Sequence, residues 1–272
     1  MSPSLIETPS IECEIENYLK QVGDVFRKFR WQDSGCISYG VKSEGERWFV
    51  KYSKQPEGLE SLRRAEALHS QVQHPALAKL HHVITSLDGI ALVFDWLPGE
   101  VLYDYVTHRG QQGRNNPGSP HYRFRSLPEE KILTALDIIF ELHILLAEKG
   151  FIAVDFYDGC IMYDFEKERT FVVDLDEYQL GPFTMEVDRL PGSRRFMAPE
   201  ECVKGSEIDQ VTNVFTLGRT VVELLGSGSV ERLRGSEAMK AVIRRAVDPN
   251  RAQRYPSVGA FVEAWNQAKS QN

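Results

Sequence analysis

The stretch that decides the fold reads GFIAVDFYDGCIMYDFEKERTFVVDLDEY and covers residues 150–178. Two of its segments, CIMYD (160–164) and TFVVDLD (170–176), have the composition of short strands, and the polar residues FEKER join them. Asp155 lies in the loop before this hairpin, and Asp174 ends its second strand. Asp155 is therefore either a loop aspartate that makes ordinary turn hydrogen bonds or the centre of an active site.

The part of the chain before this stretch carries mostly strand signals. Residues 26–52 read as strands around the turn SEGE, and residues 77–97 read as two further strands around Ser-Leu-Asp-Gly. Between them, residues 57–73 carry apolar side chains at helical spacing. Residues 1–22 form a polar lead-in with room for a short helix. We therefore expect a small antiparallel sheet with one helix in this part.

The part around and after the stretch is mostly helical. A long amphipathic helix is predicted from about Pro128 to Lys149, and helical patterns continue from residue 198 to the end. Residues 108–127 are rich in Gly, Asn, Pro and Arg without periodicity, which predicts a mobile surface loop. Its basic side chains either dock an acidic partner or are simply solvated. The order of elements predicts an α+β protein with two lobes, joined by a linker near residues 95–100 that could form a hinge over a cleft.

Composition narrows the class of protein. A chain of 272 residues with 42% hydrophobic side chains can build one large domain or two lobes with cores of their own. The net charge of −7 argues against a general affinity for nucleic acid or anionic membrane. The most apolar run, residues 132–156, is broken by charged side chains, and residues 1–19 are too acidic for a secretory signal. The four cysteines lie far apart, so neither a zinc site nor a disulfide framework is indicated, and we expect a cytoplasmic protein.

Five features then follow one another along the chain. Lys51 lies in the strand segment WFVKYS, Glu66 lies on the next helix, and Asp155 and Asp174 flank the hairpin, followed by MAPEE at 197–201. In this order they resemble the eukaryotic-type (Hanks-type) protein serine/threonine kinase family, in a divergent form. The resemblance extends from about residue 24 to about residue 268. It implies a polar extension (1–22), a kinase N-lobe (23–95) with a small sheet and one helix, and a larger, mostly helical kinase C-lobe (96–272).

The resemblance also implies three catalytic roles. Lys51 would meet the α- and β-phosphates of ATP, and Glu66 would orient that lysine, with Glu60 as the weaker alternative. Asp155 resembles the aspartate of the H-R-D motif and would accept or orient the proton of the attacking hydroxyl.

Further residues match the nucleotide and metal positions of the family. Asp174 resembles the metal-binding aspartate of D-F-G, although this sequence reads D-L-D, and the oxygens of Asp176 and Asp158 are further candidate ligands for Mg²⁺ or Mn²⁺. The segment VFDWLPGE (93–100) resembles the hinge that reads adenine. The set of residues that the resemblance assigns to nucleotide binding is Lys51, Gly35, Phe94 as gatekeeper, and the backbones of Asp95 and Leu97.

Three further matches concern the structure around the site. Glu200 of MAPEE resembles the glutamate that pairs with a late arginine, for which Arg254 is the favoured match. Gly192-Ser193 resembles the start of the substrate-docking segment, which favours serine/threonine over tyrosine chemistry. Asn213 stands where the family has an aspartate that braces the catalytic loop, and an amide oxygen can still accept a hydrogen bond.

Several positions depart from the family pattern. The glycine-rich loop is reduced to WQDSGCI (31–37), in which Gly35 is the remaining glycine and Asp33 adds a negative charge. Ala153-Val154 replaces His-Arg before Asp155. Tyr157 stands in place of a lysine that would neutralise the transferred phosphoryl group, and Cys160 stands in place of a metal-binding asparagine.

Three functions remain open on these residues. The leading hypothesis is a divergent ATP-dependent protein kinase that transfers phosphate from ATP–Mg to a serine or threonine hydroxyl of a protein substrate. The alternatives are a pseudokinase, which acts as a binding or scaffold module, and a kinase that acts on a small molecule. We expect ATP and Mg²⁺ (or Mn²⁺) as cofactors and a protein as substrate or binding partner, with no role for nucleic acid or membrane.

Overall fold

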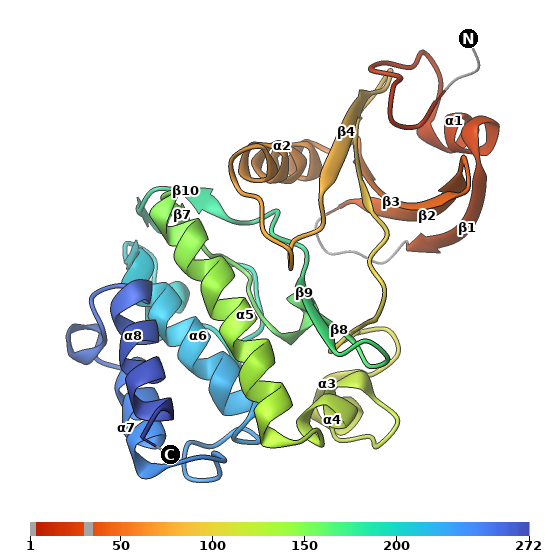
Figure 1. Ribbon diagram of the computed structural model, residues 1–272. Helices are drawn as coiled ribbons and strands as arrows, with labels where there is room; N and C mark the ends of the chain where they lie inside the picture. The colour runs from red at the N-terminus through yellow and green to blue at the C-terminus, as the bar shows by residue number, and fades with distance from the viewer. Residues whose placement is uncertain (1–3, 30–34, 272) are drawn as a thin grey trace. The chain divides into compact units, whose positions relative to one another are not determined.

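The computed structural model describes residues 4–29 and 35–271. The chain divides into two compact units, Met1–Pro98 and Gly99–Asn272, and the boundary falls inside the predicted linker. The class is α+β, as expected, with a five-stranded antiparallel sheet in the first unit and most of the helices in the second (Figure 1).

The sheet of the first unit follows the two predicted hairpins. Its strands are β1 (Asp24–Phe29), β2 (Ile37–Ser43), β3 (Glu46–Ser53), β4 (Leu80–Thr85) and β5 (Ile90–Asp95), in the order β1-β2-β3-β5-β4 with antiparallel neighbours. Glu44 and Gly45 join β2 to β3 with φ of 54° and 88°. Two consecutive left-handed residues match the twist of a tight hairpin, which is why the SEGE signal is confirmed.

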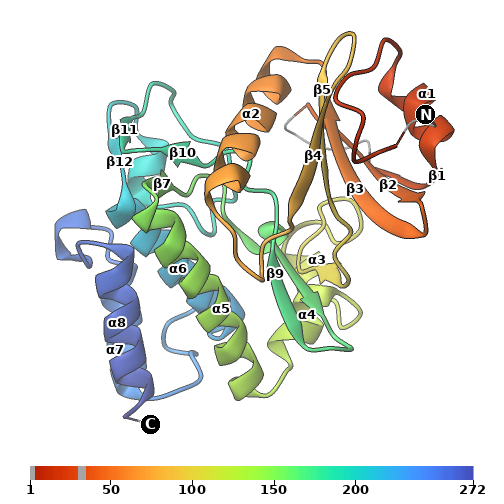
Figure 2. The ribbon, with the colours of Figure 1, turned by 45° about the horizontal axis from the view of Figure 1, so that its top comes forward.

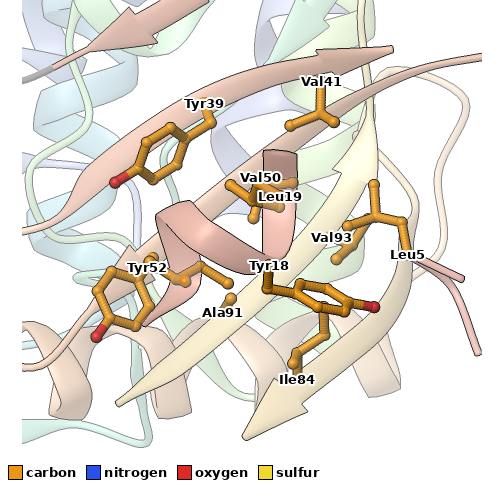
Figure 3. Close-up of a cluster of buried hydrophobic side chains, with 11 residues drawn as sticks. Leu5, Tyr18, Leu19, Tyr39, Val41, Val50, Tyr52, Ile84, Ala91 and Val93 are labelled. Carbon is orange, nitrogen blue, oxygen red and sulfur yellow. The ribbon is translucent and has the colours of Figure 1, made fainter. Parts of the chain in front are cut away.

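Helices cover both faces of this sheet. On one face, α1 (Ile15–Val22) packs Tyr18 and Leu19 against strand side chains such as Tyr39 and Val50, as Figure 3 shows. On the other face, α2 (Pro56–Gln71) packs Leu62 against apolar side chains of β5. Leu5, Ile15, Tyr18 and Leu19 thus contribute to the core of this unit, although residues 4–22 are otherwise largely polar. The sequence pattern missed this because the buried side chains are few and separated by charged residues.

The second unit is built on a group of helices. They are α5 (Glu129–Glu148), α6 (Gln210–Leu224), α7 (Glu237–Ala246) and α8 (Val258–Lys269). The long predicted helix is confirmed almost to the residue, with Pro128 and Lys149 as its caps. Helices α5, α6 and α8 lie side by side (Figure 2), and Phe140 of α5 contacts the rings of Phe261 and Trp265 on α8.

The second unit also contains several short paired strands. The predicted hairpin is present as β8 (Ile161–Asp164) paired with β9 (Arg169–Val172), and β6 (Glu100–Val101) adds a third strand. The remaining strands are β7 (Phe151–Ile152) paired with β10 (Gln179–Leu180), and β11 (Phe183–Thr184) paired with β12 (Glu207–Ile208). Single 3₁₀ turns occur at Asp158–Cys160, Pro199–Cys202 and Arg251–Gln253.

The segment 108–127 is not the irregular loop that the sequence predicts. It forms α3 (Gly110–Arg114) and α4 (Pro120–Arg125), and Ser119 caps α4 by accepting a hydrogen bond from the Tyr122 amide. Phe124 is fully buried and meets the ring of Tyr163 on β8 at 5.0 Å. Helices of five and six residues are too short to produce a periodic pattern. The glycine and proline residues of the segment therefore predict a loop.

Within residues 4–29 and 35–271, no helix has both the length and the apolar character needed to cross a membrane.

Candidate functional site

The loop that carries Asp155 is held by its backbone. The side-chain amide of Asn213, on α6, accepts a hydrogen bond from the Ala153 amide and donates one to the Ala153 carbonyl, both at 2.8 Å. Both groups are buried, so neither bond competes with water. Asn213 thus braces this loop as predicted. Asp155 follows with φ of 61°, a left-handed conformation in which a short polar side chain such as Asp is among the tolerated types.

Asp155 and Asp174 are tied together through Cys160. The Cys160 thiol donates to the Asp155 carbonyl at 3.2 Å, and the Cys160 carbonyl accepts from the Val173 amide at 2.8 Å. Asp174 follows directly and is also left-handed, with φ of 62°. Burial raises the pKa of the Cys160 thiol well above its usual range, and the charges of Asp174 and Asp155 raise it further. Cys160 is therefore a buried thiol that connects the two aspartate loops, and its burial disfavours the thiolate form that a metal would need.

Tyr157, in the place of the family's lysine, is also neutral. Its ring lies at 6.5 Å from that of Tyr103 and at 6.4 Å from that of Phe196, both in edge-on contact. Burial raises the pKa of its hydroxyl, and the neighbouring Cys160 and Asp155 add to the effect. The ring packs so closely over Gly159 that a Cβ there would lie 2.5 Å from a ring carbon. Tyr157 thus fixes the loop by packing and brings no positive charge.

Asp158 is held by Arg114 of α3. The guanidinium donates to both carboxylate oxygens, at 2.5 and 2.8 Å, and the two side chains are 5% and 0% exposed. Arg114 also stacks on the ring of Tyr103, with its guanidinium carbon 3.4 Å from the ring centroid. Burial alone would lower the pKa of Arg114, but the hydrogen bonds and charge of Asp158 raise it. Because both oxygens of Asp158 are engaged, this geometry argues against the predicted metal role of Asp158.

The segment that follows residue 190 lies against Asp155. A Cβ built on Gly192 would be 3.3 Å from the Asp155 carboxylate, so a glycine, with φ of 129°, allows this close approach. Gly192 and Ser193 line a small cavity together with Asp155. The second unit therefore brings the predicted docking segment to the predicted catalytic aspartate.

The predicted ion pair between Glu200 and Arg254 is present. The Arg254 guanidinium donates to both Glu200 oxygens, at 2.6 and 2.9 Å, in a bidentate arrangement. Burial works against the charge of Glu200, but the hydrogen bonds from Arg254 keep the pKa of that carboxyl below its usual value. The pair joins the MAPEE segment to the loop before α8.

In the first unit, Lys51 lies on the face of the sheet that α2 covers. Side chains alternate along a strand, and its neighbours Val50 and Tyr52 belong to the core on the α1 face. Lys51 pairs across the sheet with Leu92, whose side chain packs with Leu62 of α2. Lys51 is 5% exposed, a degree of burial that is rare for a lysine.

The two glutamates considered as partners of Lys51 differ in their surroundings. Glu60 lies 3.4 Å from Arg64 in an ion pair one turn along α2, and its side chain is 76% exposed. Glu66 is half-buried and lies next to the buried Ala65. The lower exposure of Glu66 favours it over Glu60 as the partner of Lys51, and the pairing of Glu66 with Lys51 stays a prediction.

The hinge residues occupy the end of β5. Phe94 is buried and contacts the ring of His69 on α2 at 4.9 Å. The Asp95 amide donates to the Lys79 carbonyl, and its carboxylate lies 2.7 Å from His81. In the described part of the chain, no hydrogen bond engages the amide or the carbonyl of Leu97. Leu97 therefore presents a backbone donor and acceptor of the kind that would read an adenine edge.

The predicted nucleotide loop is only partly described. Gly35 has φ of 69°, and its carbonyl accepts a hydrogen bond from the Ser53 hydroxyl at 3.1 Å. Residues 30–34, which include Asp33, lie outside the described residues.

The remaining metal candidates differ in exposure. Asp174 is exposed, whereas Asp176 is 6% exposed and lies next to the buried Leu175. Among the residues that the structure describes, no three His, Cys, Asp or Glu side chains gather closely enough to form a metal site on their own. Magnesium usually takes only one or two carboxylates and completes its shell with phosphates and water. Asp174 is thus the carboxylate that fits the role of a metal ligand beside a bound triphosphate.

Two residues near the site carry no signal in the sequence analysis. Arg114 stands among the basic side chains of a glycine-rich segment, and nothing in its neighbourhood along the chain indicates Asp158 as its partner. Glu201 follows Glu200 directly, yet it is 3% exposed and lines the same cavity as Asp155. Two adjacent glutamates in a polar segment are both predicted to be exposed. Only the folded chain shows that Glu200 and Glu201 have different surroundings.

A scan against models of protein families finds no match to this chain. No curated protein matches the sequence at a significant level.

Proposed function

We propose that the protein is a divergent ATP-dependent protein kinase, which transfers the γ-phosphoryl group of ATP to a serine or threonine hydroxyl. The observation that carries this proposal is the tied pair of aspartate loops in the second unit. Asp155 and Asp174 lie on either side of Cys160, both in left-handed conformation, and Asn213 holds the backbone just before Asp155. Left-handed conformations of residues other than glycine are uncommon, and they concentrate at functional sites.

Each residue has a defined task in this reaction. The acceptor oxygen bonds to the γ-phosphorus as the bond to the bridging oxygen of ADP breaks, and Asp155 takes the hydroxyl proton. Lys51 would meet the α- and β-phosphates. A divalent cation held by Asp174 would supply charge neutralisation on the phosphates. Lys51 is 5% exposed on the face of the sheet that α2 covers, at the strand position that the resemblance assigns to the phosphate-binding lysine, and this supports its role.

A second candidate function rests on Tyr157 and Cys160. Both side chains are neutral and packed, so neither supplies the positive charge or the metal ligand that the family has in these places. Loss of such a charge removes a large electrostatic contribution to phosphoryl transfer. This favours a pseudokinase, in which nucleotide binding without transfer would control a binding partner.

The test begins with binding. Thermal unfolding is measured with ATP and Mg²⁺, with ATP and Mn²⁺, and with ATP alone, for the wild type and for Lys51→Met. A nucleotide present at a hundred times its Kd stabilises the folded state by about 2.7 kcal/mol. Lys54→Met is a matched control, since Lys54 lies nearby on the chain but its side chain is 51% exposed and pairs with Asp88. We expect a shift for the wild type and the control and a reduced shift for Lys51→Met.

Transfer is then measured with labelled ATP, with protein acceptors, the chain itself and small hydroxyl compounds in separate reactions. We expect label on protein serine or threonine, abolished by Asp155→Asn. Stabilisation by ATP without any transfer would replace the proposal by the pseudokinase function. Transfer to small molecules alone would assign the third function, and no stabilisation by millimolar ATP would refute every nucleotide-dependent function.

A further inference from the structure

A small cavity lies behind the Asp155 loop, inside the second unit. It is lined by Asp155, Gly192, Ser193, Glu201 and Thr216, among others. Its free volume is about 10 Å³, which is close to the smallest cavity that holds one water molecule. Asp155 and Glu201 therefore line one small space that admits about one water molecule.

Glu201 is held in this position by the fold around it. One of its oxygens accepts a hydrogen bond from the Ala198 amide at 2.6 Å, and the whole residue is 3% exposed. Its neighbour Glu200 forms the bidentate ion pair with Arg254. No hydrogen bond or ion pair from an Arg or Lys side chain reaches Glu201 within the described ranges.

The charged groups around Glu201 favour its protonated form. Burial raises the pKa of Glu201 to about 8. The hydrogen bond from the Ala198 amide and the charge of Arg254 oppose this, whereas the charges of Glu200 and Asp155 add to it. Two carboxyl groups that share a site cannot both ionise easily, so the one with less stabilisation keeps its proton.

We propose that Glu201 is a positioning residue for Asp155, which keeps its carboxyl proton at neutral pH and directs that proton toward Asp155 across the cavity that both side chains line. The neutral Glu201 adds no charge to this space, and a hydrogen bond across the cavity, direct or through one water, fixes the Asp155 carboxyl group. Loss of the Glu201 proton places a second negative charge there and displaces Asp155. This inference rests on the proposed function, since the displacement matters for Asp155 as the base of phosphoryl transfer.

The first experiment measures the pH dependence of stability, which needs no activity. Between an ordinary glutamate pKa of 4.5 and the folded value of about 8, the folded state holds a proton that the unfolded state has lost. Stability therefore falls as pH rises through this window, and the unfolding constant rises by up to tenfold per pH unit from this group. In Glu201→Gln the amide keeps an acceptor for the Ala198 amide and cannot ionise. We expect its stability to fall less steeply than that of the wild type between pH 5 and 8.

The second experiment measures phosphoryl transfer from pH 6 to 9.5 for the wild type, Glu201→Gln and the control Glu263→Gln, an exposed position on α8. We expect wild-type and control rates to fall as pH passes about 8, and the rate of Glu201→Gln to remain level there. If Glu201 had a purely structural role, Glu201→Gln would change the rate at every pH, and the rate would still fall above about pH 8.

The outcomes separate this inference from the proposed function. Transfer with coincident pH profiles for the wild type and Glu201→Gln would overturn the role of Glu201 and leave the kinase function intact. Absence of transfer from the wild type at every pH would overturn both. Should Glu201→Gln fail to fold, the wild-type profile decides, since a rate that stays level beyond pH 9 refutes the inference.

Discussion

The ion pair between Arg114 and Asp158 is the contact whose removal tests the architecture of the site most directly. Both side chains are almost fully buried, and the guanidinium meets both carboxylate oxygens. Removal of one partner leaves the other charge buried without compensation, which costs about 3–5 kcal/mol. Arg114→Met also loses the stacking on Tyr103, worth about 0.5–2 kcal/mol. Each single substitution thus removes a large share of the roughly 5–15 kcal/mol that stabilises a typical domain.

Replacement of both partners has a different consequence. In the double variant Arg114→Met/Asp158→Leu no charge stays buried, so its stability should lie within about 2 kcal/mol of the wild type. The double variant should therefore be more stable than either single variant, a coupling that distant sites do not show. Urea unfolding at pH 7 of the wild type, Arg114→Met, Asp158→Leu and the double variant completes the cycle.

The control is the exposed pair of Arg123 and Glu100, whose side chains are 40% and 50% exposed. Arg123→Met should cost less than about 1 kcal/mol, because solvent screens such pairs. Single variants at Arg114 and Asp158 with wild-type stability would refute the reasoning. A stable Asp158→Asn that loses stabilisation by ATP and Mg²⁺ would instead restore Asp158 as a metal ligand.

Three further predictions concern the packing around the site. Asn213→Ala removes both hydrogen bonds to the Ala153 backbone and leaves two buried groups unpaired, so it should cost about 2–6 kcal/mol in urea unfolding. It should also reduce the proposed phosphoryl transfer further than Asn213→Asp. Arg254→Met leaves Glu200 without its bidentate partner and should destabilise by about 3–5 kcal/mol, whereas Arg254→Met with Glu200→Gln should recover part of that loss. Gly159→Ala places a Cβ 2.5 Å from the Tyr157 ring and should cost about 1–3 kcal/mol of stability. Tyr157→Leu in the same chain should relieve this loss. An unchanged unfolding midpoint for Gly159→Ala would contradict the packing of the ring.

Local patterns accounted for most of the elements near the site. The turn SEGE predicted the hairpin of β2 and β3, and periodicity predicted a helix from about Pro128 to Lys149, where the structure has α5 (Glu129–Glu148). The strands β8 and β9, with Asp155 before them and Asp174 after them, also follow from alternation and polarity over a few residues. Such features depend on neighbours along the chain, which the sequence displays directly.

The contacts that hold the site together depend on residues far apart. Arg114 and Asp158 are 44 positions apart, and Asn213 lies 60 positions from Ala153. An arginine in a glycine-rich segment gives the same local sequence pattern whether its side chain is solvated or pairs with a buried carboxylate. The prediction of an irregular segment at 108–127 was wrong, and the sequence carries no sign that a guanidinium engages both oxygens of Asp158.

The sequence by itself determined the strands, the helices and the loops that present Asp155, Asp174 and Lys51, because hydrophobic periodicity and turn residues act over short distances. Only the tertiary structure decided which carboxyl groups are buried, which are exposed and which have a cationic partner. The fold buries Asp158 against the Arg114 guanidinium and leaves Asp174 exposed. It also places Glu201 at the lining of a cavity that Asp155 lines as well. The physical reason is that the charge state and role of a carboxyl group depend on its burial and partners, which form only when distant segments pack together.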